Sequence, residues 1–153
     1  MIIIACNTSY YFYEEYISHS QVPIYHLIDE SIKNIKEKKM KKVGILATDG
    51  TIQSSLYQKS CEKFSIDWEI PSTDKQKTIM DIIYTYLKKG EEVPKQLFQS
   101  VIDEMKQKGV DCVILACTEL SMLKETWNLS SFYVDPLDIA TVYIIEKFNK
   151  KLK

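Results

Sequence analysis

The sequence contains no arginine, so all 20 of its basic residues are lysines, and 21 acidic residues bring the net charge at pH 7 to -1. Nucleic-acid binders usually present a cationic face whose arginines grip phosphates and base edges, so we expect no nucleic-acid partner. No stretch reaches the 18 apolar residues of a membrane-spanning helix, so we expect no membrane partner. The apolar start Met1–Ala5 lacks the charge and cleavage site of a signal peptide, which predicts a cytoplasmic protein with reduced thiols.

Glycine is scarce, at four residues, and no G-x-G-x-x-G, P-loop or G-x-S-x-G motif is present. Binding of dinucleotides or nucleoside triphosphates and α/β-hydrolase chemistry therefore have no support. The four cysteines form no C-x-x-C pair, and Cys112 and Cys117 are spaced to point to opposite faces of a strand. These spacings argue against a metal site and against thioredoxin-like redox chemistry.

The strongest pattern is a short β-branched apolar run that ends in a small residue, then Cys or Thr, then a polar stretch that opens a helix. It occurs three times, at residues 2–8, 43–49 and 113–119. Continuous apolar runs of this kind are typical of strands covered on both faces, as in parallel sheets. A chain of 153 residues can bury a core large enough to fold without a disulfide or metal staple.

Strands and helices are expected to alternate along the whole chain. Beyond the three motif strands at 2–5, 43–47 and 113–116, the pattern predicts strands near 23–27, 66–70 and 132–134 and helices near 10–19, 29–39, 51–64, 74–88, 94–108, 119–127 and 136–149. Asp135 followed by Pro136 is typical of a helix start, and Gly109 of a helix end. The fold class predicted is α/β, with parallel sheets flanked by helices and joined by right-handed crossovers.

Three side chains follow the motif strands, namely Cys6, Thr48 and Cys117. Ligands of open α/β sheets bind at the carboxyl ends of the strands, beside the N-termini of the following helices. That position is expected to lower the pKa of a thiol and to supply thiolate near neutral pH. Two thiols in matched settings indicate a pair that faces across a cleft between similar lobes, where one removes an α-proton and the other returns a proton to the opposite face.

Cysteine is among the most often buried residue types, so a cysteine at a strand end is more commonly part of the core. We assign Cys61 and Cys112 to the core for that reason. Cys6 and Cys117 differ because each follows an alanine and precedes polar residues that suit a helix cap. His19 and His26 are isolated and are interpreted as surface or packing residues.

The motifs Ala5-Cys6-Asn7-Thr8, 46–52 (LATDGTI), 115–120 (LACTEL) and 134–140 (VDPLDIA) resemble the aspartate/glutamate racemase superfamily, most closely its aspartate racemase branch. The resemblance runs along essentially the whole chain. It implies two similar α/β lobes, one comprising residues 1–41 with 131–153 and the other residues 42–130. It also implies a homodimer and cofactor-independent racemisation of a small-molecule amino acid, with aspartate the first expectation and glutamate the second.

Carried over by motif, the resemblance makes Cys6 and Cys117 the two catalytic thiols. The residues that it implies bind the amino acid are Asn7, Thr8, Thr48, Thr51, Lys88, Thr118 and Glu119. Lys88 takes the place of a lysine that aspartate racemases aim at the side-chain carboxylate. The two thiols argue against single-cysteine decarboxylases of the same superfamily.

The chain departs from the family pattern in two places. Ser9-Tyr10-Tyr11 follows the first motif where relatives usually have a histidine, and relatives carry a further N-terminal segment that is absent here. The first lobe is therefore expected to be incomplete, with an unpaired strand edge beside residues 2–5. The alternative to an active racemase is a truncated, weak or inactive racemase-like protein that binds amino acids or a partner subunit.

Overall fold

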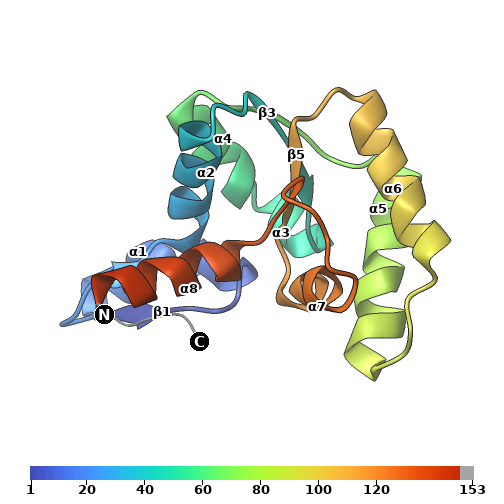
Figure 1. Ribbon diagram of the computed structural model, residues 1–153. Coiled ribbons are helices and arrows are strands. Elements are labelled where there is room, and N and C mark those ends of the chain that lie inside the picture. The colour runs from blue at the N-terminus through green and yellow to red at the C-terminus, as the bar shows by residue number, and fades with distance from the viewer. Residues whose placement is uncertain (149–153) are drawn as a thin grey trace.

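The computed structural model describes residues 1–148 and contains two parallel sheets with helices around them (Figure 1). Its elements, in chain order, are β1 (Ile2–Ile3), η1 (Thr8–Phe12), α1 (Tyr13–His19), β2 (Ile24–Tyr25), α2 (Leu27–Glu37), β3 (Lys42–Leu46), α3 (Asp49–Gln53), α4 (Leu56–Phe64), β4 (Asp67–Glu69), α5 (Thr73–Asp81), η2 (Ile82–Tyr86), η3 (Leu87–Lys89), α6 (Lys95–Gln107), β5 (Cys112–Leu115), α7 (Thr118–Thr126), β6 (Tyr133–Val134) and α8 (Pro136–Lys147). The predicted α/β class with parallel sheets is confirmed.

The larger sheet has the strand order β4-β3-β5-β6, and every pair in it is parallel. In Figure 1, α2 and α4 lie on one side of β3 and β5, while α5 and α6 lie on the other. Side chains alternate between these layers, so Ile45 and Ile114 join the core with α2 and α4, while Leu46 and Leu115 join the core with α5 and α6. Burial on both faces explains why the strands are apolar at successive positions.

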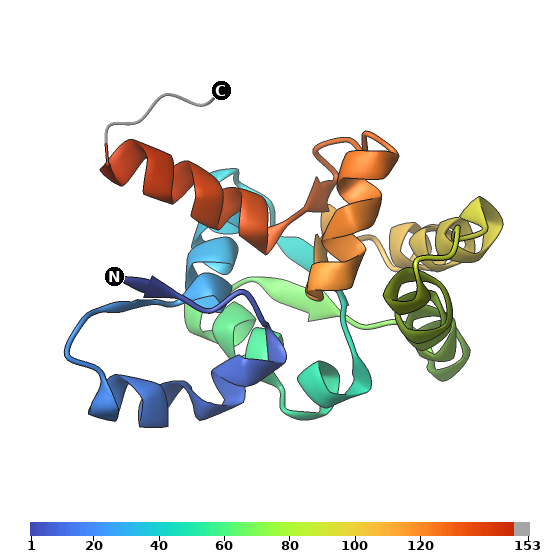
Figure 2. The same ribbon diagram turned by 90° about the horizontal axis from the view of Figure 1, so that it is seen from below.

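The smaller sheet pairs β1 with β2 in parallel and lies beside α1 and α8 (Figure 2). It holds only these two strands within the described residues, and the exposed side chain of Ile2 lies at its edge. The strand predicted over 2–5 is thus shorter, at Ile2–Ile3. The resemblance implied that residues 131–153 belong to the first lobe with residues 1–41. Strand β6, which lies in that segment, pairs with β5 in the larger sheet. Residues 149–153 lie outside the described part of the chain.

Two predicted helices are interrupted. The helix expected over 51–64 breaks into α3 and α4 because the Ser54 hydroxyl donates back to the carbonyls of Gly50 and Thr51, and Ser55 turns to the left-handed region with φ of 55°. The helix expected over 74–88 continues from α5 into the π-helical turn η2 and the 3-10 turn η3. This change of helical pitch determines where Lys88 emerges.

The expected helix start at Asp135 is confirmed, since its Oδ1 accepts a hydrogen bond of 2.8 Å from the Leu137 amide. Gly109 has the positive φ of 72° expected after a helix end. Across residues 1–148, none of the helices combines the length and the apolar character needed to cross a bilayer.

Candidate functional site

Part of the candidate set lies at the carboxyl ends of β3 and β5, which are neighbours in the larger sheet. Leu46 and Leu115 are paired in register, and the Ala116 amide donates to the Leu46 carbonyl at 2.8 Å. Thr48 and Cys117 each follow one alanine after these strands and directly precede α3 and α7. The structure therefore places both residues at one sheet edge, as the sequence predicted.

Three threonine hydroxyls join the segment after β1 to this edge. Thr51 Oγ1 lies 2.7 Å from Thr8 Oγ1 and 3.2 Å from Thr48 Oγ1. Two hydrogen bonds consume two of the three hydroxyl protons, which leaves one proton free to donate to a bound ligand. Thr8 is two residues from Cys6, so the chain of hydroxyls ties the first thiol segment to the strand edge that adjoins Cys117.

Asn7 is held from a different element. Its side chain is buried, and its Oδ1 accepts a 2.6 Å hydrogen bond from the hydroxyl of Tyr57 on α4. Cys6, directly before it, is exposed to solvent. The turn between β1 and η1 therefore presents one exposed thiol beside one anchored amide.

The second thiol lies in a different setting. Cys117 is 8% exposed, and its Sγ donates to Glu119 Oε2 at 2.9 Å. The Thr118 hydroxyl donates to the same oxygen at 3.0 Å. Lys88 Nζ lies 3.7 Å from the other carboxylate oxygen, Oε1, and 4.2 Å from the ring centroid of Tyr84. Four predicted residues therefore form one contact cluster around the Glu119 carboxylate.

The expected lowering of the Cys117 pKa by the helix N-terminus is wrong. Burial, followed by the hydrogen bond to Glu119, raises the pKa of Cys117 to about 12. Burial also acts to raise the pKa of Glu119, but the hydrogen bonds from Cys117 and Thr118 and the charge of Lys88 outweigh it and hold that pKa below its ordinary value. Cys117 is therefore a protonated thiol beside a carboxylate at neutral pH.

Replacing Glu119 with glutamine should make Cys117 more acidic. The neutral amide removes the negative charge that opposes the thiolate, while burial still keeps the pKa of Cys117 above its ordinary value of 9. The rate of iodoacetamide alkylation at Cys117, followed by mass spectrometry against pH, should rise at lower pH than in the parent. Glu125→Gln on the same helix is the control and should leave the profile unchanged. An unshifted profile in Glu119→Gln would show that Glu119 has no influence on the thiol.

The predicted site residues thus fall into two contact groups, one around Thr51 and one around Glu119, and Cys6 makes no side-chain hydrogen bond within the described residues. Asn7 belongs to neither group, since its side chain is held by Tyr57 on α4. Tyr57 was not predicted from the sequence. Nor was Gln76, whose Nε2 donates to the Ala47 carbonyl and to Asp49 Oδ1 and so fixes the turn after β3.

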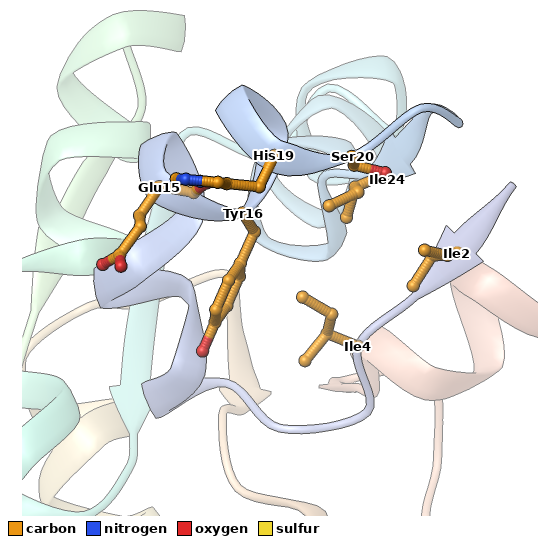
Figure 3. Close-up of a pocket in the computed structure, with 7 residues that line it drawn as sticks. All are labelled: Ile2, Ile4, Glu15, Tyr16, His19, Ser20 and Ile24. Atoms are coloured by element: carbon orange, nitrogen blue, oxygen red, sulfur yellow. The ribbon is translucent and has the colours of Figure 1, made fainter.

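A hollow with a largely apolar lining lies away from these residues. Figure 3 shows it between β1, α1 and β2, and its volume is about 620 Å³. Its lining is Ile2, Ile4, Glu15, Tyr16, His19, Ser20 and Ile24, a largely apolar set that contains no thiol. A second hollow of about 520 Å³ lies beside α7 and includes Thr118. Within residues 1–148, no group of three or more His, Cys, Asp or Glu side chains is arranged to hold a metal ion.

Two related proteins each match more than three quarters of this chain. Over 122 residues the chain is 31% identical to the broad specificity amino-acid racemase RacX of Bacillus subtilis, covering 78% of this chain and 52% of that one. Over 123 residues it is 32% identical to an uncharacterized protein in the pnlA 3′ region of Pectobacterium carotovorum, covering 79% of each.

Among solved structures, aspartate racemase from Picrophilus torridus superimposes with a TM-score of 0.81 at 25% identity, over 99% of this chain and 63% of that one. The chain therefore spans between half and two thirds of the length of these two racemases. Residues 1–144 match the family described as Asp/Glu/hydantoin racemase. The fold, the relatives and the family match agree that this chain belongs to the Asp/Glu/hydantoin racemase family.

Proposed function

We propose that the protein is an isomerase that racemises an acidic amino acid, aspartate before glutamate, without a cofactor. The observation that carries the proposal is the hydroxyl chain from Thr8 through Thr51 to Thr48, which ties the Cys6 segment to the strand edge that adjoins Cys117. Similarity to an aspartate racemase and to a broad specificity amino-acid racemase supports this substrate class.

The two thiols take different parts in one direction of the reaction. Cys6, as thiolate, removes the proton from Cα, and the electron pair of the C–H bond is delocalised into the α-carboxylate. Cys117, whose pKa of about 12 keeps it protonated, delivers its proton to the opposite face of Cα. The thiol and the thiolate have then exchanged places, so the product state is ready for the reverse direction.

The remaining residues hold the substrate. Asn7 and the one hydroxyl proton that Thr8, Thr48 and Thr51 leave free donate to the α-carboxylate, whose charge increases as the proton leaves. Thr118, whose hydroxyl is bonded to Glu119, joins them once Glu119 turns to the substrate. Glu119 is suited to the α-ammonium group and Lys88 to the side-chain carboxylate. In the structure these two charges lie 3.7 Å apart and face each other, so a substrate with both charges would replace this contact with two of its own. We further propose that the site lies between the two lobes of a homodimeric, cytoplasmic protein.

A second candidate function is amino-acid binding without turnover. It is favoured by the exposure of Cys6 and by the absence, within residues 1–148, of a hydrogen bond between Cys6 and the Cys117 cluster. Such a protein would bind the amino acid through Lys88 and Glu119 and leave its α-proton in place.

One measurement separates these functions: deuterium incorporation from solvent at Cα of L- and D-aspartate, then L- and D-glutamate, by NMR without added pyridoxal phosphate. A racemase should exchange the α-proton and invert the stereocentre. Exchange with retention would mean that only one thiol is correctly placed. A cooperatively melting sample that shows no exchange with any of the four substrates would reject the racemase and leave the binding protein.

A further inference from the structure

Tyr57 is a buried polar group at the site that the proposed reaction does not use. It lies on α4, fully enclosed in the core, and its hydroxyl donates to Asn7 Oδ1 at 2.6 Å across 50 positions of sequence. Among the described residues the hydroxyl has no other hydrogen-bond partner. A buried hydroxyl proton is costly to leave without an acceptor, so this contact is the one that the phenol requires.

The contact fixes which way the Asn7 carboxamide is turned. The phenol proton needs an acceptor, and of the two ends of the amide only Oδ1 accepts. Because the amide is planar, Nδ2 then points away from Tyr57. No residue in the described part of the chain accepts a hydrogen bond from Nδ2. This atom is also not among the fully enclosed polar atoms without a partner, so solvent or a bound ligand can reach it.

The phenol keeps its proton throughout the pH range in which a thiol-based reaction would run. Burial raises the pKa of Tyr57 well above 10, and the charges of Tyr10 and Asp135 act in the same direction. Tyr57 therefore stays a hydrogen-bond donor, and the orientation of Asn7 does not depend on pH in that range.

We propose that Tyr57 is a positioning residue that turns the Asn7 carboxamide so that Nδ2 donates to the α-carboxylate of the amino acid. This inference rests on the proposed function, since it names how one of its binding groups is held. The α-carboxylate gains negative charge when Cα loses its proton, so a donor that is already oriented stabilises the transition state more than the bound substrate.

The test begins with Tyr57→Phe, which keeps the ring and removes the hydroxyl. We expect kcat/KM for exchange to fall about tenfold, mostly in kcat, while the protein still melts cooperatively. In an Asn7→Ala background the same substitution should cause no further loss, because the phenol acts through Asn7. Asn7→Asp keeps the acceptor for Tyr57 but lacks the donor, so it should fold normally and lose activity. Tyr13→Phe, which removes a 3.1 Å hydrogen bond to the Ile24 carbonyl, is the control and should keep the parent's activity.

Parent-level activity in Tyr57→Phe would overturn the proposal, as would losses that multiply in the double variant. If the parent protein itself catalyses no exchange, the proposed function fails, and the positioning is then tested alone. The order parameter of the Asn7 side-chain N–H bonds, from ¹⁵N relaxation, should fall in Tyr57→Phe and remain unchanged in Tyr13→Phe. An unchanged value in Tyr57→Phe would overturn the positioning role whatever the reaction.

Discussion

Cys6→Ser and Cys117→Ser should each reduce racemisation of aspartate by roughly 10³-fold, the scale of a lost general acid or base. A serine hydroxyl is far less acidic than a thiol, so it neither supplies an anion for the Cα proton nor gives up its own proton readily. Both variants keep the number of side-chain atoms, because only the sulfur is replaced, by an oxygen. The exchange assay with both enantiomers, followed by NMR in deuterated solvent, measures the loss.

The two variants should also differ from one another. Cys117→Ser retains Cys6 on one face of Cα and should still exchange the α-proton of a single enantiomer. Cys6→Ser retains only Cys117, whose pKa of about 12 keeps it protonated, so it should exchange neither enantiomer at a comparable rate. Cys61→Ser and Cys112→Ser are matched controls, since both thiols are buried in the core with α2 and α4, on the other face of the sheet from Cys117. A Cys6 or Cys117 variant that inverts aspartate at the parent's rate would refute the two-thiol mechanism.

The sequence predicted the fold well because its main signals are local. Runs such as Val113–Leu115 are apolar at every position since both faces of β5 are covered, and a two-sided sheet leaves no other pattern. Asp135 and Gly109 mark helix ends through their own backbone preferences. The break between α3 and α4 was missed because Ser54 and Ser55 are tolerated inside a helix, and only their hydrogen bonds and φ angles reveal the turn.

The placement of the candidate residues could be predicted in part from the sequence, whereas their electrostatic setting could not. Motif position places Thr48 and Cys117 at one sheet edge, because β3 and β5 are paired. It does not give the pKa of Cys117, since burial and Glu119 act against the helix terminus and outweigh it. Tyr57 carries no sequence signal at all, because its partner Asn7 is 50 positions away and a tyrosine in an amphipathic helix is indistinguishable from an ordinary core residue.

Thr51→Val should lower the rate of exchange about 100-fold and the free energy of unfolding by about 1–2 kcal/mol. Thr51 is 1% exposed, and valine fills almost the same volume, so packing is preserved while the central hydroxyl of the chain is lost. Thr8 then has no link to Thr48, and the segment with Cys6 is released from the strand edge. Small displacements of a reacting group cost large factors in rate, so the activity should fall far more than the stability.

Two further variants decide whether the hydroxyl or the packing at position 51 is responsible. Thr51→Ser keeps the hydroxyl and loses only a methyl group, so it should restore most of the exchange rate despite a small cavity. Thr141→Val removes a hydroxyl that bonds only to the Leu137 carbonyl on exposed α8, so it should change neither activity nor stability appreciably. If Thr51→Val exchanged within twofold of the parent, the hydroxyl chain would have no part in placing Cys6. If Thr51→Ser were as slow as Thr51→Val, the methyl contact would be the link between the two thiol segments.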